Sequence, residues 1–233
     1  MGREHVVILT GAGVSAESGL GTFRDAGGLW IRVDLAEVAT PEGYRADPVK
    51  VLDFYNARRA TCRKARPNPA HAAIARLQQA RAGRVTLVTQ NVDDLHERAG
   101  SPEVIHMHGE LARALCAGCG HRWPQHTEMS LADACPGCGI IGMIRPDVVW
   151  FGEIPYHMEE IGRRLARATL FVAIGTSGAV YPAAGFVAEA KANGARAVEI
   201  NLEPSENAGL FDARRLGPAS QTVPAWVAEL LGD

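Results

Sequence analysis

Short apolar runs alternate with amphipathic segments along the 233-residue chain, and this alternation predicts the order of its elements. Five runs have the length and the apolar content of buried strands. They are Val6–Thr10, Val85–Asn91, Val104–Gly109, Leu170–Ser177 and Ala197–Glu203. Helical patterns fill most of the gaps between them. The alternation is typical of an α/β fold with a mainly parallel sheet.

Two segments interrupt the alternation. Residues 35–66 have a helical pattern without an intervening strand, and they include a helix that Asp47 can cap and Pro48 can begin. Residues 115–143 contain four of the cysteines. Residues 68–82 predict a further helix, capped by the asparagine at their start.

Small or polar residues lie at the end of each predicted strand. Ligands bind outside the carboxyl ends of the strands in an open parallel sheet, so these residues share one candidate edge. Any one such turn is ordinary loop chemistry. Five such turns at the same edge of the sheet are better explained by a binding site than by ordinary loops. They are Gly11, Ala12 and Gly13; Gln90 and Asn91; His108 and Gly109; Gly175, Thr176 and Ser177; and Asn201, Leu202 and Glu203.

The sequence GAGVSA, directly after the first run, partly matches the dinucleotide-binding fingerprint, with Ala16 in place of the third glycine. Glycines in this turn let the backbone approach a pyrophosphate at a helix N-terminus. A dehydrogenase would also have a second strand ending in an acidic residue about twenty residues later. The segment FRDAGGLWIRVDLAEV contains no clean strand. The pattern therefore favours a nucleotide-binding loop and argues against hydride transfer.

Four cysteines form two Cys-x-x-Cys pairs separated by fifteen residues: Cys116, Cys119, Cys135 and Cys138. This is the spacing of a four-thiolate zinc site, and four protein ligands leave no position for a substrate. We therefore expect one structural zinc ion. Cys62 is expected to be a packing residue, and His121 and His126, between the pairs, are expected to be surface residues.

The composition narrows the cellular setting. The formal net charge is −2 and no long run of one sign occurs, so nothing suggests a nucleic-acid or anionic-membrane surface. The first apolar run is too short for a signal peptide, and no stretch approaches the roughly eighteen apolar residues of a membrane span. Paired Cys-x-x-Cys motifs are more typical of reduced cysteines in a reducing compartment than of cysteines in a disulfide framework. We expect a soluble, cytoplasmic protein without nucleic-acid or membrane partners.

These motifs together resemble the sirtuin family of NAD-dependent protein lysine deacylases. The resemblance rests on GAGVSAESGLGTFRDAGGLW, TQNVDDLHERAG, IHMHGEL, the four cysteines, RPDVVWFGE, GTSGAVYPAAGF and NLEPS, and it spans nearly the whole chain. It implies a Rossmann-type NAD-binding domain of residues 1–34, 67–113 and 144–233. A helical insert, 35–66, and a zinc-ribbon insert, 114–143, would form a smaller lobe. Gly21 and Thr22 stand where many sirtuins have Pro-Asp, and a threonine there resembles the subgroup that acts on acidic acyl groups.

The resemblance also implies roles for individual residues. His108 would be the general base, although a histidine at a strand end is by itself more often structural than catalytic. The acyl oxygen would attack C1′ of the NAD ribose as nicotinamide leaves, and His108 would activate a ribose hydroxyl to attack the resulting alkylamidate. The residues implied to bind NAD, the co-substrate, are Gly11, Ala12, Gly13, Ser15, Thr22, Phe23, Arg24, Trp30, Gln90, Asn91, Asp93, Gly175, Thr176, Ser177, Asn201, Leu202, Glu203 and Ala219.

Tyr55 and Arg58 are three residues apart and therefore leave the same face of their helix. From the residues alone, both could lie on a solvated face with Arg59 and Arg63, because arginine is seldom fully buried. In a sirtuin, however, a Tyr-x-x-Arg pair at this place resembles the subgroup that removes succinyl and malonyl groups. The substrate-binding residues implied around the acyl group are Ala39, Tyr55, Arg58, Val149, Phe151 and Gly152.

The expected function is NAD-dependent deacylation of acylated-lysine proteins or peptides, as a deacetylase and a desuccinylase or demalonylase. The products would be nicotinamide, free lysine and O-acyl-ADP-ribose. Two alternatives share the same NAD site: a mono-ADP-ribosyltransferase, and a non-catalytic NAD-sensing module. The presence of Asn91, Asp93 and His108 together argues against the non-catalytic module.

Overall fold

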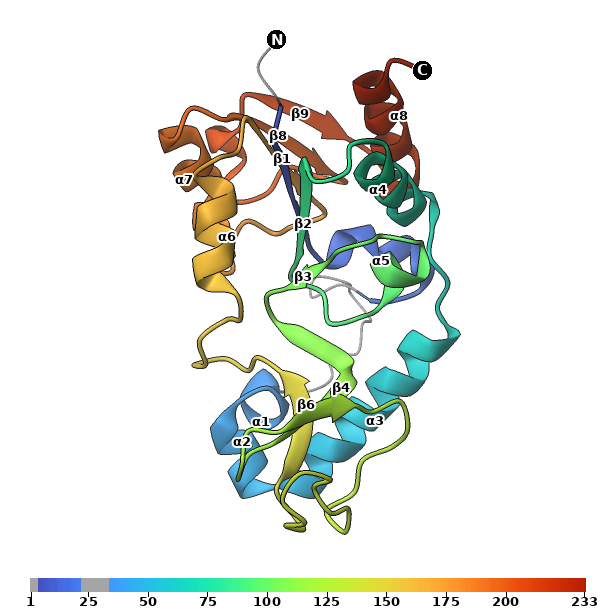
Figure 1. Ribbon diagram of the computed structural model, residues 1–233, viewed down its shortest axis with the longest axis vertical. Coiled ribbons are helices and arrows are strands. Elements are labelled where there is room, and N and C mark those ends of the chain that lie inside the picture. The colour runs from blue at the N-terminus through green and yellow to red at the C-terminus, as the bar shows by residue number, and fades with distance from the viewer. Residues whose placement is uncertain (1–3, 22–33) are drawn as a thin grey trace.

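The computed structural model describes residues 4–21 and 34–233, and its larger part is a six-stranded parallel sheet (Figure 1). The strand order is β3-β2-β1-β7-β8-β9. The strands are β1 (Val6–Thr10), β2 (Val85–Thr89), β3 (Ile105–His106), β7 (Leu170–Ile174), β8 (Arg196–Asn201) and β9 (Ala213–Leu216). All neighbouring strands pair in parallel, which confirms the expected α/β class.

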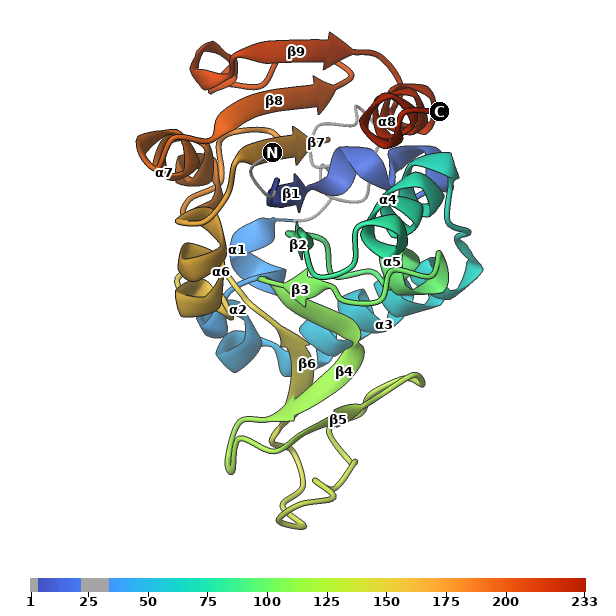
Figure 2. The same ribbon diagram turned by 45° about the horizontal axis from the view of Figure 1, so that its top comes forward.

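Helices cover both faces of this sheet, which explains why its strands are continuous apolar runs. Alternate residues of β1 face opposite clusters: Val6 and Ile8 pack in one, Val7 and Leu9 in the other. Figure 2 shows α4 (Pro69–Ala80) and α8 (Ala219–Leu231) on one side of the sheet, and α6 (Met158–Leu165) and α7 (Phe186–Ala192) on the other. The core of the larger part therefore consists of two layers of side chains around a fully buried β1.

A smaller antiparallel sheet, of order β5-β4-β6, lies at the other end of the molecule (Figure 2). Its strands are β4 (Gly109–Cys116), β5 (Arg122–Pro124) and β6 (Ile144–Val148). Three helices pack beside it: α1 (Leu35–Val38), α2 (Pro41–Ala46) and α3 (Pro48–Lys64). The predicted cap of α3 is confirmed, because the Asp47 side chain accepts a hydrogen bond from the Lys50 N–H.

The predicted strands differ from the observed ones mainly at their ends. The runs expected to end at Asn91, Ser177 and Glu203 leave the sheet two or three residues earlier, because their polar ends turn out of the ladder. The run expected to end at Gly109 is divided between β3 and the start of β4. Strand β9, ARRL, was not predicted, because it is a short polar edge strand without an apolar signal.

The order of the sheet decides where a ligand can bind. Strand β1 lies inside the sheet, with β2 on one side and β7 on the other, so the connections leave in opposite directions at this point. Such a switch point opens a crevice at the carboxyl ends of the strands. Among the described residues, no helix is long and apolar enough to cross a membrane.

Candidate functional site

The turn after β1 packs backbone to backbone against the turn after β7. The Gly13 N–H donates to the Gly175 carbonyl at 2.9 Å. A Cβ atom on Gly13 would lie 2.7 Å from the Gly175 Cα, and Gly175 itself has a φ of +63°. Both positions therefore require glycine. The short 3-10 turn Ala12–Val14 follows β1 directly, where the dinucleotide-binding fingerprint has its pyrophosphate-binding turn.

Buried polar side chains form a network behind this turn. The Ser15 hydroxyl donates to Asp93 Oδ2 at 3.1 Å and accepts from Asn91 Nδ2 at 3.2 Å. Asn91 Nδ2 also contacts the Gly11 carbonyl oxygen at 3.1 Å. Burial raises the pKa of Asp93, and hydrogen bonds from the Leu95 N–H and from Ser15 oppose that rise. Three residues implied to bind NAD are therefore preorganised by contacts with one another.

Two fully buried histidines extend the network, and the sequence analysis did not identify them. His71 Nε2 lies 3.3 Å from Ser15 Oγ, and its Nδ1 accepts from the Asn68 N–H. His96 Nε2 lies 3.1 Å from Thr10 Oγ1, and the two imidazole rings are 4.8 Å apart. Burial lowers the pKa of His71 to about 4. The spacing of Asn68 and His71, a capping box at the start of α4, was the signal that could have revealed the first of them.

His108 lies at the edge of the site, just beyond β3, and its side chain is half-buried. Its Nδ1–H donates to the Gln90 carbonyl at 3.1 Å, which leaves Nε2 as a proton acceptor. Burial lowers the pKa of His108, and the contact with Gln90 only partly offsets this. The imidazole is therefore neutral at neutral pH, as a general base must be.

His106, two residues earlier, has a different environment. Its Nδ1 contacts the Asn91 carbonyl at 3.1 Å, and its Nε2 lies 2.7 Å from Glu97 Oε1. Burial is the largest single influence on His106 and would lower its pKa. The hydrogen bond and the charge of Glu97, with smaller contributions from Glu110 and the Asn91 carbonyl, together outweigh burial, and the pKa is raised. Both ring nitrogens are occupied, so His106 supports the loop that carries Asn91.

Those of the remaining residues implied to bind NAD that the structure describes follow the carboxyl ends of β7, β8 and β9. Thr176 is buried, and its carbonyl accepts from Asn201 Nδ2 at 2.8 Å. Leu202 and Glu203 are exposed beyond β8, and Ala219 begins α8. Thr22, Phe23, Arg24 and Trp30 lie outside the described residues.

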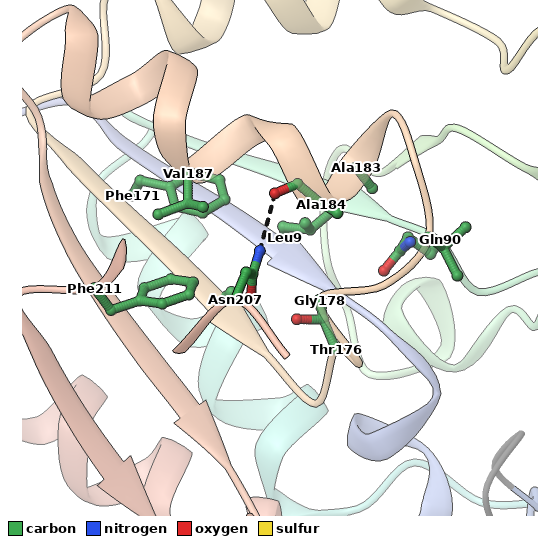
Figure 3. Close-up of a pocket in the computed structure, with 12 residues that line it drawn as sticks. Leu9, Gln90, Phe171, Thr176, Gly178, Ala183, Ala184, Val187, Asn207 and Phe211 are labelled. Carbon is green, nitrogen blue, oxygen red and sulfur yellow. Dashed lines mark hydrogen bonds between the residues drawn. The ribbon is translucent and has the colours of Figure 1, made fainter. Parts of the chain in front are cut away.

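Gln90 and Thr176 also line a cavity of about 10 Å³ between the strand ends and α7 (Figure 3). Its far side includes Asn207, whose Nδ2 donates to the Ala184 carbonyl at 2.9 Å. A volume of this size holds about one water molecule. A nucleotide must therefore lie outside this cavity, along the open strand ends.

The four predicted zinc ligands lie together: Cys116 ends β4, Cys119 is in the turn after it, and Cys135 and Cys138 are between β5 and β6. Their Sγ atoms all lie within 4.8 Å of one another. The Cys116–Cys138 and Cys119–Cys135 sulfur separations are 3.8 and 3.7 Å. Bonds of about 2.3 Å from a tetrahedral zinc ion place sulfur atoms roughly 3.8 Å apart, so the donor set fits zinc. His121 and His126 are exposed, as expected.

Tyr55 lies inside the smaller lobe, and Arg58 is half-buried beside it. The Tyr55 hydroxyl accepts from Trp150 Nε1 at 2.9 Å, and the Arg58 guanidinium lies 5.6 Å from the centre of the Tyr55 ring. Burial lowers the pKa of Arg58 and raises that of Tyr55. The helix face that carries both residues is therefore not the solvated face considered above.

Arg59 was expected to suit a solvated face, and this expectation is wrong. Its side chain is only 2% exposed, because α3 turns it toward β4, where Nε donates to the Leu111 carbonyl at 2.8 Å. Arg63 is exposed, as expected. The helical pattern gave both arginines the same apparent environment, and only the packing of the ribbon on α3 separates them.

The segment after β6 joins His108 to the Tyr55 region. The Val149 N–H donates to the His108 carbonyl, and the Phe151 N–H donates to the Ala39 carbonyl, both at 2.9 Å. Ala39 is buried, whereas Phe151 and Gly152 are exposed. The residues implied to bind the acyl group are thus connected by backbone hydrogen bonds to the candidate general base.

The fold and the site define an α/β nucleotide-binding protein with a thiolate zinc ribbon inserted into it. The family model described as "Sir2 family" matches residues 11–182, and the chain belongs to this family.

Relatives and solved structures agree with that assignment. A protein of Caulobacter vibrioides named NAD-dependent protein deacylase is 58% identical over 233 residues, covering 99% of this chain and 98% of the relative. A Sir2 homologue solved in complex with NAD superposes with a TM-score of 0.89 at 38% identity, covering 98% of this chain and 90% of that one. A mutant Sir2 homologue in complex with 2′-O-acetyl ADP-ribose gives a TM-score of 0.89 at 37% identity, covering 98% and 92%.

Proposed function

We propose that this protein is an NAD-dependent protein-lysine deacylase that removes acetyl groups and the acidic succinyl and malonyl groups. The observation that carries the proposal is the state of His108, a neutral imidazole at the ligand edge of the sheet with Nδ1 bonded to Gln90 and Nε2 left as an acceptor. The nature of the relatives supports it: the Caulobacter protein is named a deacylase, and the solved homologues bind NAD or an acetylated ADP-ribose.

NAD is the co-substrate and supplies a ribose carbon that becomes electrophilic as nicotinamide departs. The turns that carry Gly11, Gly13 and Gly175 pack backbone against backbone, because side chains there would collide, and glycine turns at this place let backbone N–H groups approach a pyrophosphate. Ser15, Asn91 and Asp93 orient the nicotinamide end, and their mutual hydrogen bonds hold them in place before NAD arrives. Such preorganisation avoids a reorganisation cost at the moment of reaction.

His108 acts as the general base. Its Nε2 accepts the proton of a ribose hydroxyl, which then attacks the carbon of the acyl group. The Gln90 carbonyl holds the ring orientation and the tautomer through Nδ1–H. With one water molecule consumed in the hydrolysis that releases the lysine, the products are free lysine, nicotinamide and O-acyl-ADP-ribose.

Arg58 and Tyr55 recognise the carboxylate of an acidic acyl group. A guanidinium offers a bidentate fork to a carboxylate. Because the Tyr55 oxygen already accepts from Trp150, its own proton is available to donate to the acyl group. Ala39 is small, which leaves room for a longer acyl chain, and Val149, Phe151 and Gly152 border the lysine.

The zinc ion has a structural role, since four thiolates close its coordination sphere. We divide the chain into an NAD-binding domain of residues 1–34, 67–113 and 144–233, and a smaller lobe formed by inserts 35–66 and 114–143. The four thiols of the zinc site require a reducing compartment, so we place the protein in the cytoplasm, acting on acylated-lysine proteins or peptides.

The test is a reaction of purified protein with NAD and matched acetyl-, succinyl- and unmodified-lysine peptides, followed by mass spectrometry. Deacylation is established by peptides that lose the acyl mass while an equal amount of acylated ADP-ribose appears. Transfer of ADP-ribose to the unmodified peptide would instead identify a mono-ADP-ribosyltransferase. NAD binding without consumption would identify a sensing module.

A further inference from the structure

Helix α3 presents two different faces to its surroundings. Tyr55 and Arg58 form one face, at the proposed acyl site. Leu52, Asn56 and Arg59 form the neighbouring face, which contacts β4 and the zinc ribbon. Leu52 packs in a buried cluster with two of the zinc ligands, Cys116 and Cys135. In Figure 1, α3 runs alongside β4 in the smaller lobe.

Asn56 joins α3 to the loop between the two cysteine pairs. Its Nδ2 donates to the Met129 carbonyl at 2.9 Å, and its Oδ1 accepts from the Met129 N–H at 2.9 Å. The amide side chain thus satisfies both backbone groups of one ribbon residue. Asn56 Oδ1 also accepts from Arg59 Nη1 at 2.8 Å. Hydrogen bonds therefore link Asn56 and Arg59 of α3 with Met129 of the ribbon.

Arg59 completes the connection. Its Nε donates to the Leu111 carbonyl at 2.8 Å, and its Nη2 lies 3.5 Å from the Met129 sulfur. Burial lowers the pKa of Arg59 to about 10. In the described part of the chain, no carboxylate lies within salt-bridge distance of it. A buried cation held by neutral acceptors contributes little net stability, and such groups can instead specify one arrangement of the elements they join.

We propose that Asn56 and Arg59 are positioning residues for the recognition of acidic acyl groups. They fix the rotation of α3 against the zinc ribbon, and that rotation aims Arg58 and Tyr55 at the acyl carboxylate. Asn56 directly follows Tyr55, and Arg59 directly follows Arg58. A rotation of the helix about its axis therefore moves both faces together. The inference rests on the proposed deacylase function, and it assigns the ribbon a part in choosing the acyl group.

The test compares Asn56→Ala with two other single variants, Arg58→Met and Arg63→Met, on succinyl- and acetyl-lysine peptides of one sequence. Asn56→Ala should lower kcat/KM for the succinyl peptide about fivefold or more, chiefly through KM, because small misplacements of a binding group have large effects. Its kcat/KM for the acetyl peptide should change less than about twofold, since acetyl has no carboxylate to misalign. Arg63 also contacts the ribbon, through the His126 carbonyl, but it is exposed, so Arg63→Met should match the unmodified protein on both peptides.

A double variant separates positioning from general structural damage. If Asn56 acts through Arg58, then Asn56→Ala added to Arg58→Met should cause little further loss with the succinyl peptide, whereas independent effects would multiply. Zinc content should stay at one equivalent in every variant. Equal losses on both peptides with Asn56→Ala, or multiplicative losses in the double variant, would overturn the inference while leaving the proposed function intact.

Equal losses on both peptides with Arg58→Met would refute the recognition of the acyl carboxylate, and the inference with it. If Asn56→Ala fails to fold, Arg59→Lys takes its place. Lysine keeps a cation for the Leu111 carbonyl but cannot also reach Asn56 and Met129. The same selective loss on the succinyl peptide is expected, and its absence would overturn the inference.

Discussion

Replacing Arg58 with methionine removes the guanidinium while keeping an unbranched side chain of similar length. In the structure this guanidinium lies 5.6 Å from the centre of the Tyr55 ring and 5.7 Å from that of Phe54. Methionine can occupy the same aromatic surroundings through its thioether. The substitution therefore removes charge and hydrogen bonding at the acyl site with little loss of packing.

The size of the effect follows from the bonds that are lost. Hydrogen bonds to a charged group contribute about 1.5–3 kcal/mol. If these bonds act on a succinyl carboxylate, kcat/KM should fall about 10- to 150-fold. An acetyl group forms no such bonds, so kcat/KM for deacetylation should change less than about threefold on the same energy scale.

The assay measures kcat/KM for succinyl- and acetyl-lysine peptides of identical sequence at saturating NAD, with mass-spectrometric detection of products. Arg63→Met is the matched control, because it removes an exposed arginine from the same helix. A selective loss on the succinyl peptide supports the proposed role. Equal losses on both peptides would assign Arg58 to the scaffold, and no loss on either would remove it from the acyl site.

Four further predictions concern the catalytic base, the metal and one buried histidine. His108→Ala should lower turnover about 10²- to 10⁴-fold while NAD affinity stays nearly unchanged; a comparable loss of affinity in a binding titration would make His108 a binding residue. Because the pKa of His108 is lowered and the neutral form is the active one, kcat/KM should rise with pH through a midpoint below the ordinary histidine pKa of about 6.5; an acidic limb with its midpoint above that value would contradict this. Cys135→Ser should reduce zinc content and soluble yield together, and full zinc occupancy in that variant would show that the site is misassigned. The pKa of His71 is about 4 in the folded state and near 6.5 when unfolded, so its contribution of roughly 3 kcal/mol is present above pH 6.5 and is lost as pH falls toward 4. Thermal unfolding of His71→Asn should be less sensitive to pH across that window, and an unchanged pH dependence would refute the assignment.

Local patterns were sufficient for several parts of the molecule. The five apolar runs predicted five parallel strands. Strands of a sheet that is covered on both faces are buried on both sides, so they are continuous apolar runs that are easy to recognise. The cap at Asp47 was predictable because capping depends on a few neighbouring residues. The four cysteines were predictable for a similar reason, since ligand spacing within each pair is a property of one tight turn.

Other features depended on partners distant in sequence. His96 has no unusual local pattern, and the capping box marks His71 only as part of a helix start. Both become part of the site only because α4 and α5 (Leu95–Arg98) bring them beneath Ser15 and Thr10. Strand β9 was not predicted, and the run predicted as one strand at 104–109 is divided between β3 and β4. Both differences have the same cause, a dependence on partners distant in sequence. The pairing of β3 and β9 is decided by the edges that neighbouring strands offer.

The class of the fold, the metal site, the glycine turns and the family could all be predicted from the sequence, because each depends on short spacings between residues. The environments of similar side chains could not, because they depend on how distant segments pack. His106 and His108 are two residues apart, yet Glu97 raises the pKa of one while burial lowers that of the other. Arg59 and Arg63 share a helix and both contact the ribbon, yet Arg59 is buried and Arg63 is exposed. Burial and charge partners set these differences, and both come from segments that are far away in the chain.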